Sequence, residues 1–495
     1  MKNKIVLVFI IALALVLRVY RLDKLPSILN RDEAALAYNG LLLSQSGKDE
    51  FGKSWPLTLE SFGDYKLPGY PYTLALLFKF LPNNDLVVRL PSAIAGVALV
   101  ALSYFLAGPL LAFLIAITPV FLFYSRMAFE ANIALFFLVL FLYCWEHKKY
   151  LWSLLSIILS ILFYNTALLL LPFIMGGLFF NKKQRHLPSI LVLFIVFILS
   201  WWQLASVSKQ KAGITIFSDE TVWKQQVDYY ESFDNKIWQK VLGNKYLFYA
   251  QIITKNYLCS FSPQFLLLKG GTHPWHNLPN SGHLYFVIYF LALLGIIVSI
   301  YRRKNLFWLY LLFISLLPAV ITVDAPHATR SLLFFYCLSY SAVVGLKNLS
   351  PLIFPSPINR RGDLGVRLYL IFIFILTLES IFYLKKYFLD YPQQLPEVFY
   401  PGFAEIIQDT DQKFPDTKIA VIDPSSYQYI LAAWYLQTPA DKFLPSIKKQ
   451  LPDKIGFKYG EAFTHYHFIF HPEDRSQDEK ILLQWMGNHW ERQEL

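Results

Sequence analysis

Long apolar runs, separated by short charged segments, dominate this sequence. Hydrophobic residues make up 55% of its 495 residues and charged residues only 16%, whereas a soluble globular chain usually carries about 25% charge. A helix needs about 20 mostly apolar residues to cross the hydrocarbon core of a bilayer. The runs therefore predict a mainly α-helical protein that crosses a membrane several times.

The predicted transmembrane helices number about eleven. They are expected near residues 5–20, 88–107, 109–125, 131–146, 150–164, 166–181, 187–204, 284–300, 305–322, 330–346 and 367–384. We therefore predict a transmembrane domain over residues 1–384 and a soluble domain over residues 385–495.

Basic residues occupy every second loop between these runs, except the uncharged Gly108-Pro109 turn, and indicate the orientation of the chain. They occur in His147-Lys148-Lys149, Lys182-Lys183-Gln184-Arg185, Arg302-Arg303-Lys304, and from Lys347 through Arg360, Arg361 and Arg367. Cytoplasmic loops are enriched in Lys and Arg, so the N-terminus is expected in the cytoplasm of a multi-pass plasma-membrane protein. Two long loops, 21–87 and 205–283, and the C-terminal domain are then extracytoplasmic.

The net charge of +11 does not indicate a nucleic-acid partner, because the Lys and Arg residues lie in short loops rather than on one soluble face. The expected surroundings are membrane lipids. The three cysteines are far apart in the sequence and match neither a zinc motif nor a disulfide framework.

Two short helices are predicted in the first outer loop. Ala34–Ser46 has helical spacing and ends at Gly47, and Pro71–Phe80 is a short apolar segment. Neither is long enough to cross a membrane, so both are expected to lie in the membrane interface.

The tail has the pattern of a small α/β domain. Strands are expected at Lys418–Asp423 and Tyr466–Phe470, and helices from Ser425 or Ser426 through Trp434 and over Glu479–Trp490. Its aromatic residues either stack on sugars or fill its small core, and core packing is the favoured interpretation. They are Tyr427, Tyr429, Trp434 and Tyr435.

Two charged clusters of the first outer loop are candidates for chemistry. Asp32 and Glu33 are adjacent, so on a helix one points to a site and the other to a structural partner. Lys66 follows Asp64 and Tyr65 and precedes a turn containing Pro68 and Tyr70, and its ammonium suits a phosphate. The alternatives are solvated helix-start acids and a lysine that reaches the interface.

Two further clusters lie at predicted helix starts. Arg89 either anchors its helix at the headgroups or contacts an anion. Arg330 opposes the helix dipole and should therefore have an anionic partner, while His327 can donate to an anion or move a proton. Cations at the outer leaflet favour a lipid phosphate as ligand.

Weaker candidates complete the set. Arg126 and Glu130 occupy a short outer turn and are expected to pair. The spacing of His273, His276 and His283 matches no metal motif, so solvated histidines are favoured and no metal ligand is assigned.

The order of these elements resembles the GT-C membrane glycosyltransferases, in particular the protein O-mannosyltransferase and lipid A aminoarabinose transferase family. The resemblance covers roughly residues 18–130 and is carried by Asp32-Glu33-Ala34, Ala37-Tyr38, Tyr65-Lys66-Leu67-Pro68-Gly69-Tyr70 and Arg89-Leu90-Pro91-Ser92-Ala93. The later His-Ala-Thr-Arg run departs from the His-Arg-Tyr run of that family.

The resemblance implies transfer of a sugar from a polyprenyl-phosphate donor to an outer-face acceptor, with inversion by a single displacement. Asp32 would be the general base and Glu33 would orient the loop. Lys66, Arg330, His327 and Arg89 would bind the donor phosphate, and Asp64, Tyr65, Pro68 and Tyr70 would shape the site. No cofactor is required by this scheme, although Asp32 and Glu33 offer ligands for a divalent cation.

The acceptor stays open among a lipid, a glycan and a protein. A lipid or polysaccharide transporter or flippase is the main alternative, but transporters place charges near the bilayer midplane and often contain internal repeats. The informative charges here fall at the outer edge, and no convincing repeat is found. A lipid-linked oligosaccharide ligase is a second alternative.

Overall fold

The computed structural model describes residues 2–495 except 63, 182–183, 205–206, 208–212, 272, 274, 354–360, 392–395 and 453–456. The chain is mainly helical, as predicted. It divides into two compact units. Unit 1 comprises Met1–Arg18, Ile94–Ser125 and Ala131–Tyr387, and unit 2 comprises Val19–Ala93, Arg126–Glu130 and Phe388–Leu495.

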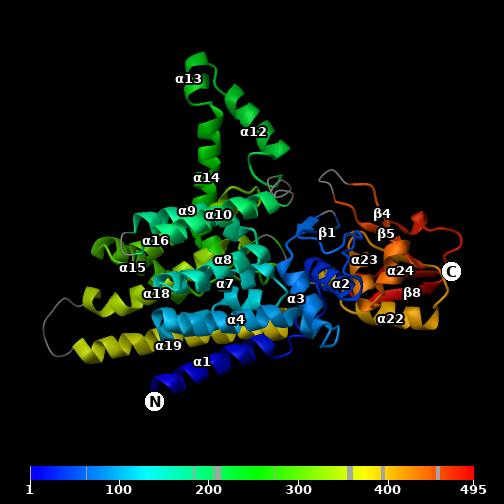
Figure 1. The fold of residues 1–495 in the computed structure, drawn as a ribbon, viewed down its shortest axis with the longest axis horizontal. Coiled ribbons are helices and arrows are strands. Elements are labelled where there is room, and N and C mark those ends of the chain that lie inside the picture. Colours follow the sequence, from blue (N-terminus) through cyan, green and yellow to red (C-terminus); the bar gives the residue numbers. More distant parts are fainter. Residues whose placement is uncertain are drawn as a thin grey trace. The chain divides into compact units, whose positions relative to one another are not determined.

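Each predicted membrane span contains one helix or a broken pair of helices (Figure 1). They are α1 (Lys2–Val19), α4 (Asp85–Ala107), α5 (Pro109–Ile117), α6 (Pro119–Ser125), α7 (Glu130–Glu146), α8 (Tyr150–Phe163), α9 (Thr166–Phe180), α10 (Leu187–Gln203), α15 (Phe286–Arg302), α16 (Leu306–Ile314), α17 (Leu317–Val320), α18 (Leu332–Ile353) and α19 (Arg361–Lys385). The 109–125 run is broken before Pro119, whose ring cannot continue a helix.

Fewer of the described helices meet the length and composition needed to cross a membrane than the sequence predicts. Among the described residues, two helices are long and apolar enough to cross a membrane, Asp85–Ala107 and Thr329–Leu349. The pair α6 and α7, bent by 116°, would make a third. The predicted count of about eleven is therefore not confirmed, because several apolar helices are too short to pass the same test. The basic residues Lys182, Lys183 and Arg360 lie outside the described residues.

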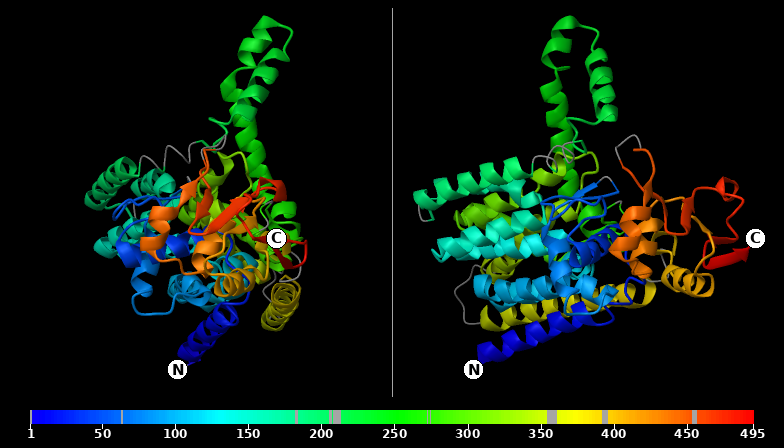
Figure 2. Two further views of the ribbon diagram at one scale, coloured as in Figure 1. Left: turned by 90° about the vertical axis from the view of Figure 1, so that its right-hand side faces the viewer. Right: turned by 45° about the vertical axis from the view of Figure 1, so that its right-hand side comes forward.

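The second long loop contains helices that the sequence analysis did not assign. They are α12 (Glu220–Glu231), α13 (Lys236–Val241) and α14 (Lys245–Phe261), followed by the π-helix η1 (Gln264–Leu268). Figure 2 shows α12, α13 and part of α14 projecting away from the other helices of unit 1. Each of the three α-helices begins after an Asp or Asn whose side chain accepts a backbone hydrogen bond.

Both predicted short helices of the first outer loop are present in unit 2. Helix α2 (Arg31–Ser46) begins earlier than predicted because Asn30 and Glu33 form a capping box, and it ends at Gly47 with φ of 68°. Helix α3 (Gly69–Leu77) packs against it. A Cβ atom on Gly40 would lie 2.7 Å from the Cβ of Leu74, so glycine permits this close approach.

The tail contains a six-stranded mixed sheet, which confirms the predicted small α/β domain. The strands are β4 (Lys448–Lys449), β5 (Gly460–Phe463), β6 (Tyr466–Ile469), β3 (Ile419–Ile422), β7 (Ile481–Trp485) and β8 (Trp490–Glu494), in that spatial order. Strand β3 is parallel to β6 and β7 and is buried throughout, as expected of a central parallel strand. The accompanying helices are α22 (Phe403–Lys413), α23 (Gln428–Tyr435) and α24 (Ala440–Ser446).

The helix predicted over Glu479–Trp490 is wrong. These residues form β7, a turn and the start of β8, which pair antiparallel. Gly487, with φ of 88°, lies in the turn and supplies the left-handed conformation that the turn requires. Pairing of β7 with β3 satisfies its backbone groups, so tertiary contacts outweigh the helical spacing.

The aromatic residues of the tail pack against the first outer loop within unit 2. Tyr429 donates a hydrogen bond of 2.7 Å to buried Glu50, and the indole of Trp434 donates one of 2.9 Å to Asp85. The hydroxyl of Tyr435 lies 2.9 Å from the same carboxylate. These contacts fix the tail on the loop that carries the predicted base.

Candidate functional site

Asp32 and Glu33 occupy the first turn of α2 and point in different directions. Asp32 has a partly exposed side chain, at 26%, whereas that of Glu33 is 1% exposed. The cause is helical geometry, which separates adjacent side chains around the axis. Only Asp32 of the two is therefore accessible to a ligand.

Glu33 lies in a buried network with Arg89. Its carboxylate accepts hydrogen bonds from Nε and NH2 of Arg89, at 3.0 and 3.2 Å. It also accepts the backbone N–H of Ala128 at 2.8 Å, so Glu33 joins α2, α4 and the turn before α7. The carboxylate caps its own helix as well, through the N–H of Asn30.

All five N–H donors of Arg89 are engaged by protein groups. Besides Glu33, the guanidinium donates to the backbone carbonyls of Leu22, Pro26 and Ile28. The side chain is fully buried. Arg89, predicted either to bind the phosphate or to anchor its helix at the headgroups, thus has every N–H bonded to protein groups and joins Glu33 to the segment before α2.

Lys66 lies between two carboxylates. It ends strand β2 (Asp64–Lys66), which pairs antiparallel with β1 (Leu59–Ser61). Its ammonium is 2.7 Å from Oδ1 of Asp32 and 3.0 Å from Oδ2 of Asp64. The loop and helix α2 thus bring together residues that lie 34 positions apart in the sequence.

The electrostatics of this cluster keep Lys66 charged. Burial opposes the charge, but Asp32, Asp64 and Glu130 outweigh it and raise the pKa of Lys66. Arg31 adds a second cation, since its guanidinium lies 5.0 Å from the centre of the Phe62 ring, over which Lys66 also lies at 5.5 Å. Positive charge therefore stays beside Asp32 across the physiological pH range.

The predicted site-shaping residues surround this cluster in different ways. Pro68 is the residue before α3, and Tyr70 is buried and donates a hydrogen bond of 2.8 Å to the carbonyl of Val88. Tyr65 has the ammonium of Lys53 at 5.5 Å from its ring centre.

Arg126, predicted to pair with Glu130, donates a 2.9 Å hydrogen bond to the carbonyl of Tyr20.

The second group of predicted residues lies in unit 1, in the loop between α17 and α18. Arg330, in the short helix η2 (Thr329–Ser331), forms an ion pair with Asp324 and donates to Thr322 at 2.9 Å. This is the anionic partner that the sequence predicts for an arginine at a helix start. Nε2 of His327 is 3.5 Å from the other oxygen of Asp324.

The charges in this loop have opposite effects on its two titratable groups. Burial works against ionisation of Asp324, yet Arg330 and His327 lower its pKa overall. Burial, followed by the charge of Arg330, lowers the pKa of His327 well below its usual range. His327 is therefore neutral at physiological pH, so one of its ring nitrogens carries a lone pair and the other a proton.

Two loop histidines join His327, although the sequence favoured solvated side chains. The ring centres of His273 and His276 lie 5.8 and 4.9 Å from that of His327. A hydrogen bond joins Nδ1 of His276 to Oγ1 of Thr329. Sequence spacing gave no signal, because about fifty residues separate these histidines from His327. His283 differs, since it packs between Phe265 and Phe335.

Comparison with known proteins shows the fold. No protein-family model and no curated protein matches the sequence. The oligosaccharyltransferase of Archaeoglobus fulgidus, in complex with Zn and sulfate, is similar in structure, with a TM-score of 0.53 and 15% identity over 87% of this chain and 61% of that protein. This chain therefore has a fold similar to that of this oligosaccharyltransferase. The apo form of that enzyme gives a TM-score of 0.51 at 13% identity, over 88% of this chain and 64% of that one.

The chain therefore has the GT-C-like fold that the sequence predicts, and it spans less than two thirds of the length of that oligosaccharyltransferase. ArnT from Cupriavidus metallidurans bound to undecaprenyl phosphate gives a TM-score of 0.48 at 14% identity, over 87% of this chain and 84% of that one. The narrower resemblance to protein O-mannosyltransferases and aminoarabinose transferases stays a prediction.

Proposed function

We propose that this protein is a membrane glycosyltransferase that moves a sugar from a polyprenyl-phosphate donor to an acceptor hydroxyl at the outer face of the membrane. The observation that carries the proposal is the contact of Lys66 with Asp32 at 2.7 Å, on a chain with the fold of an oligosaccharyltransferase. It places a carboxylate that can accept a proton beside a cation that can bind a phosphate.

In the proposed reaction, the acceptor oxygen attacks the anomeric carbon of the donor. The bond between that carbon and the phosphate oxygen breaks, and the phosphate leaves with the bonding electrons. Asp32 takes the proton of the acceptor hydroxyl, a contribution of about 10²–10⁴ in rate for a positioned base. The attack from the opposite side inverts the anomeric carbon.

Lys66 is proposed to hold the donor phosphate. The charge on this group grows as it leaves, and a fixed ammonium stabilises the growing charge without reorganisation. Binding of the phosphate also replaces Asp32 as the partner of Lys66. The carboxylate then becomes available to the acceptor hydroxyl, which couples donor binding to activation of the base.

Glu33 and Arg89 are proposed to position Asp32 rather than to contact the substrate. Both are buried and bonded to each other, and they connect α2 with α4. This structural role replaces the phosphate contact first predicted for Arg89. For Arg330 and His327 the phosphate role stays a prediction, drawn from their place in an outer loop and from the resemblance.

A small pocket in unit 1 is lined mainly by apolar side chains, among them Leu135, Leu138, Ala167, Leu332 and Leu333. The predicted orientation, with a cytoplasmic N-terminus and an extracytoplasmic tail, belongs to the same proposal.

Transfer of a whole oligosaccharide is the second candidate, because the similar structure with a TM-score of 0.53 is an oligosaccharyltransferase. One experiment tests both. Purified protein in nanodiscs receives a panel of radiolabelled polyprenyl-phosphate monosaccharides or lipid-linked oligosaccharides, with membrane extract as acceptor. Label that reaches an acceptor with wild type and not with Asp32→Asn supports the proposal, and the donor that works separates the two candidates. No transfer from any donor by folded protein would refute both.

A further inference from the structure

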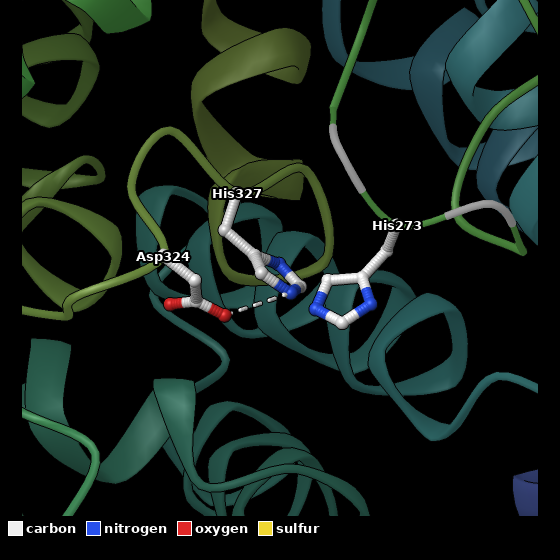
Figure 3. A group of neighbouring side chains, drawn as sticks. All are labelled: His273, Asp324 and His327. Atoms are coloured by element: carbon white, nitrogen blue, oxygen red, sulfur yellow. Dashed lines mark ion pairs between the residues drawn. The ribbon is translucent and has the colours of Figure 1, made fainter. Parts of the chain in front are cut away.

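Three side chains with nitrogen and oxygen ligand atoms gather in unit 1, two from the loop between α17 and η2 and one from the loop after η1. One ligand atom each from His273, Asp324 and His327 lies within 4.8 Å of the other two. Figure 3 shows the His273 ring next to that of His327, with the carboxylate of Asp324 directed at His327. The group therefore consists of two imidazoles and one carboxylate, which come from two separate loops.

The distances are close to those of a coordinated ion. Zinc binds imidazole and carboxylate at about 2.0–2.2 Å, so the ligands of a tetrahedral site lie about 3.3–3.6 Å apart. Oδ2 of Asp324 and Nε2 of His327 already lie 3.5 Å apart. An inward movement of His273 by about 1 Å would complete a three-ligand site of this geometry.

The surroundings hold the ligands in place. Arg330 and Thr322 bind at the carboxylate side, since Arg330 pairs with Oδ1 of Asp324 and leaves Oδ2 facing His327. Such outer contacts orient metal ligands in known sites. His327 is buried, so its ring is held among the surrounding side chains.

We propose that His273, Asp324 and His327 bind one divalent ion of the zinc class, which joins the second outer loop to the loop before α18. The ligand set, two imidazoles and a carboxylate, is the type that zinc prefers over magnesium and calcium, which favour oxygen. With three protein ligands, a fourth position stays open for water or an anion. The proposal does not depend on the transfer reaction.

The site differs from the cluster of Asp32 and Lys66. There a cation, Lys66, already occupies the space between two carboxylates. In the loop before α18, the imidazoles of His273 and His327 face each other together with a third imidazole, that of His276. Imidazole nitrogens gather here, and imidazole is a ligand that suits zinc and related transition metals.

The test measures bound metal in the full-length protein. The protein is purified in detergent with a tag that contains no histidine, stripped with a chelator, and titrated with Co²⁺, whose visible absorption reports tetrahedral imidazole ligands, and then with Zn²⁺. Bound ions are counted by mass spectrometry. We expect one ion per chain for wild type and for His147→Ala, a control in which an exposed histidine of unit 1 is removed.

His273→Ala and His327→Ala are expected to weaken binding more than about 100-fold, beyond the effect of losing an outer contact. Since His327 is buried, His273→Ala keeps the test valid if His327→Ala fails to fold. Wild type without a bound ion, or a His273→Ala protein that binds as wild type does, would overturn the proposal. Because the measurement counts metal and not transferred sugar, its failure is distinct from failure of the proposed function.

Discussion

Lys66 donates a hydrogen bond of 2.7 Å to Asp32, so the proposed phosphate ligand and the proposed base neutralise each other. A carboxylate in such an ion pair is a poor base, because the nearby ammonium stabilises its charged form. If the ammonium of Lys66 pairs with a donor phosphate instead of Asp32, the charged form of Asp32 is no longer stabilised in this way. Donor binding and proton acceptance are therefore expected to be coupled, and the effects of mutation at the two residues should differ in kind.

Asp32→Asn should lower kcat by about 10²–10⁴, the usual contribution of a positioned general base. The amide cannot accept the proton, while Lys66, which loses one of its two carboxylate partners, stays available to the donor phosphate. The donor KM is therefore expected to be unchanged or lower. Initial rates of sugar transfer at varied donor concentration measure both constants.

Asp228→Asn is the matched control, since Asp228 is an exposed carboxylate of α12. It should transfer sugar at the wild-type rate. An Asp32→Asn protein that keeps wild-type kcat would remove Asp32 from the mechanism. An increase in KM alone would assign the residue to donor binding.

Lys66→Gln should act mainly on the donor. A hydrogen bond to a charged group contributes about 1.5–3 kcal/mol, so the donor KM should rise about 10- to 100-fold. Lys66→Arg keeps the charge and should recover part of the loss. The measurement is the same rate series, supplemented by binding of polyprenyl phosphate without sugar.

Lys53→Gln serves as the control for this lysine. Lys53 pairs with Glu60 at 3.2 Å in the same outer loop, but its side chain is 50% exposed. Its removal should leave the donor KM within about twofold, because exposed ion pairs contribute little. If Lys66→Gln and Lys53→Gln raise the donor KM equally, the effect comes from a change in the whole outer loop, and Lys66 does not contact the donor phosphate.

The pair of Glu33 and Arg89 should matter chiefly for stability. Each residue is buried, and the removal of one partner leaves an unpaired charge, which costs about 3–5 kcal/mol. Glu33→Gln and Arg89→Met are each expected to lower the melting temperature in detergent, and Arg89→Met more so because it also removes the donors to three backbone carbonyls. A double variant should lose less than the sum of the two singles.

Additive losses in that double-mutant cycle would contradict direct coupling of the two residues. A phosphate role for Arg89 predicts something different, an increase of donor KM without loss of melting temperature. Measuring both quantities on the same preparation distinguishes the two roles.

The sequence predicted well those features that depend on local pattern. The helix ending at Gly47, the strand Ile419–Ile422 and the separate directions of Asp32 and Glu33 follow from helical spacing, apolar runs and helix geometry. The anionic partner of Arg330 was also expected from the helix dipole. These predictions require only residues that are near one another in the chain.

Features that depend on distant contacts were not predicted. Whether Arg89 contacts a phosphate or the carbonyls of Leu22, Pro26 and Ile28 is decided by chain folding over more than sixty positions. The grouping of His273 with His327 has the same origin. For β7, pairing with β3 supplies the hydrogen bonds that a helix would otherwise have supplied, and helical spacing cannot reveal this.

Asp423, at the end of β3, should make stability depend on pH. It is buried, and burial raises its pKa to about 7, while its Oδ2 accepts the N–H of Gln428 at 2.7 Å. The folded protein therefore keeps this proton at pH values where the unfolded chain, with an ordinary pKa near 3.8, has lost it. The stabilisation by Asp423 is complete below about pH 4 and is lost as the pH rises through about 7, with a slope of at most about 1.4 kcal/mol per pH unit.

Asp423→Asn should remove this dependence, because the amide still accepts from Gln428 and cannot ionise. Relative to the variant, wild type should lose melting temperature between about pH 4 and pH 7. Asp409→Asn is the control, since hydrogen bonds from Lys413 and Arg492 lower the pKa of Asp409 and its contribution changes only at more acidic pH. If the melting temperatures of wild type and Asp423→Asn change equally with pH over this range, Asp423 is already ionised in the folded protein.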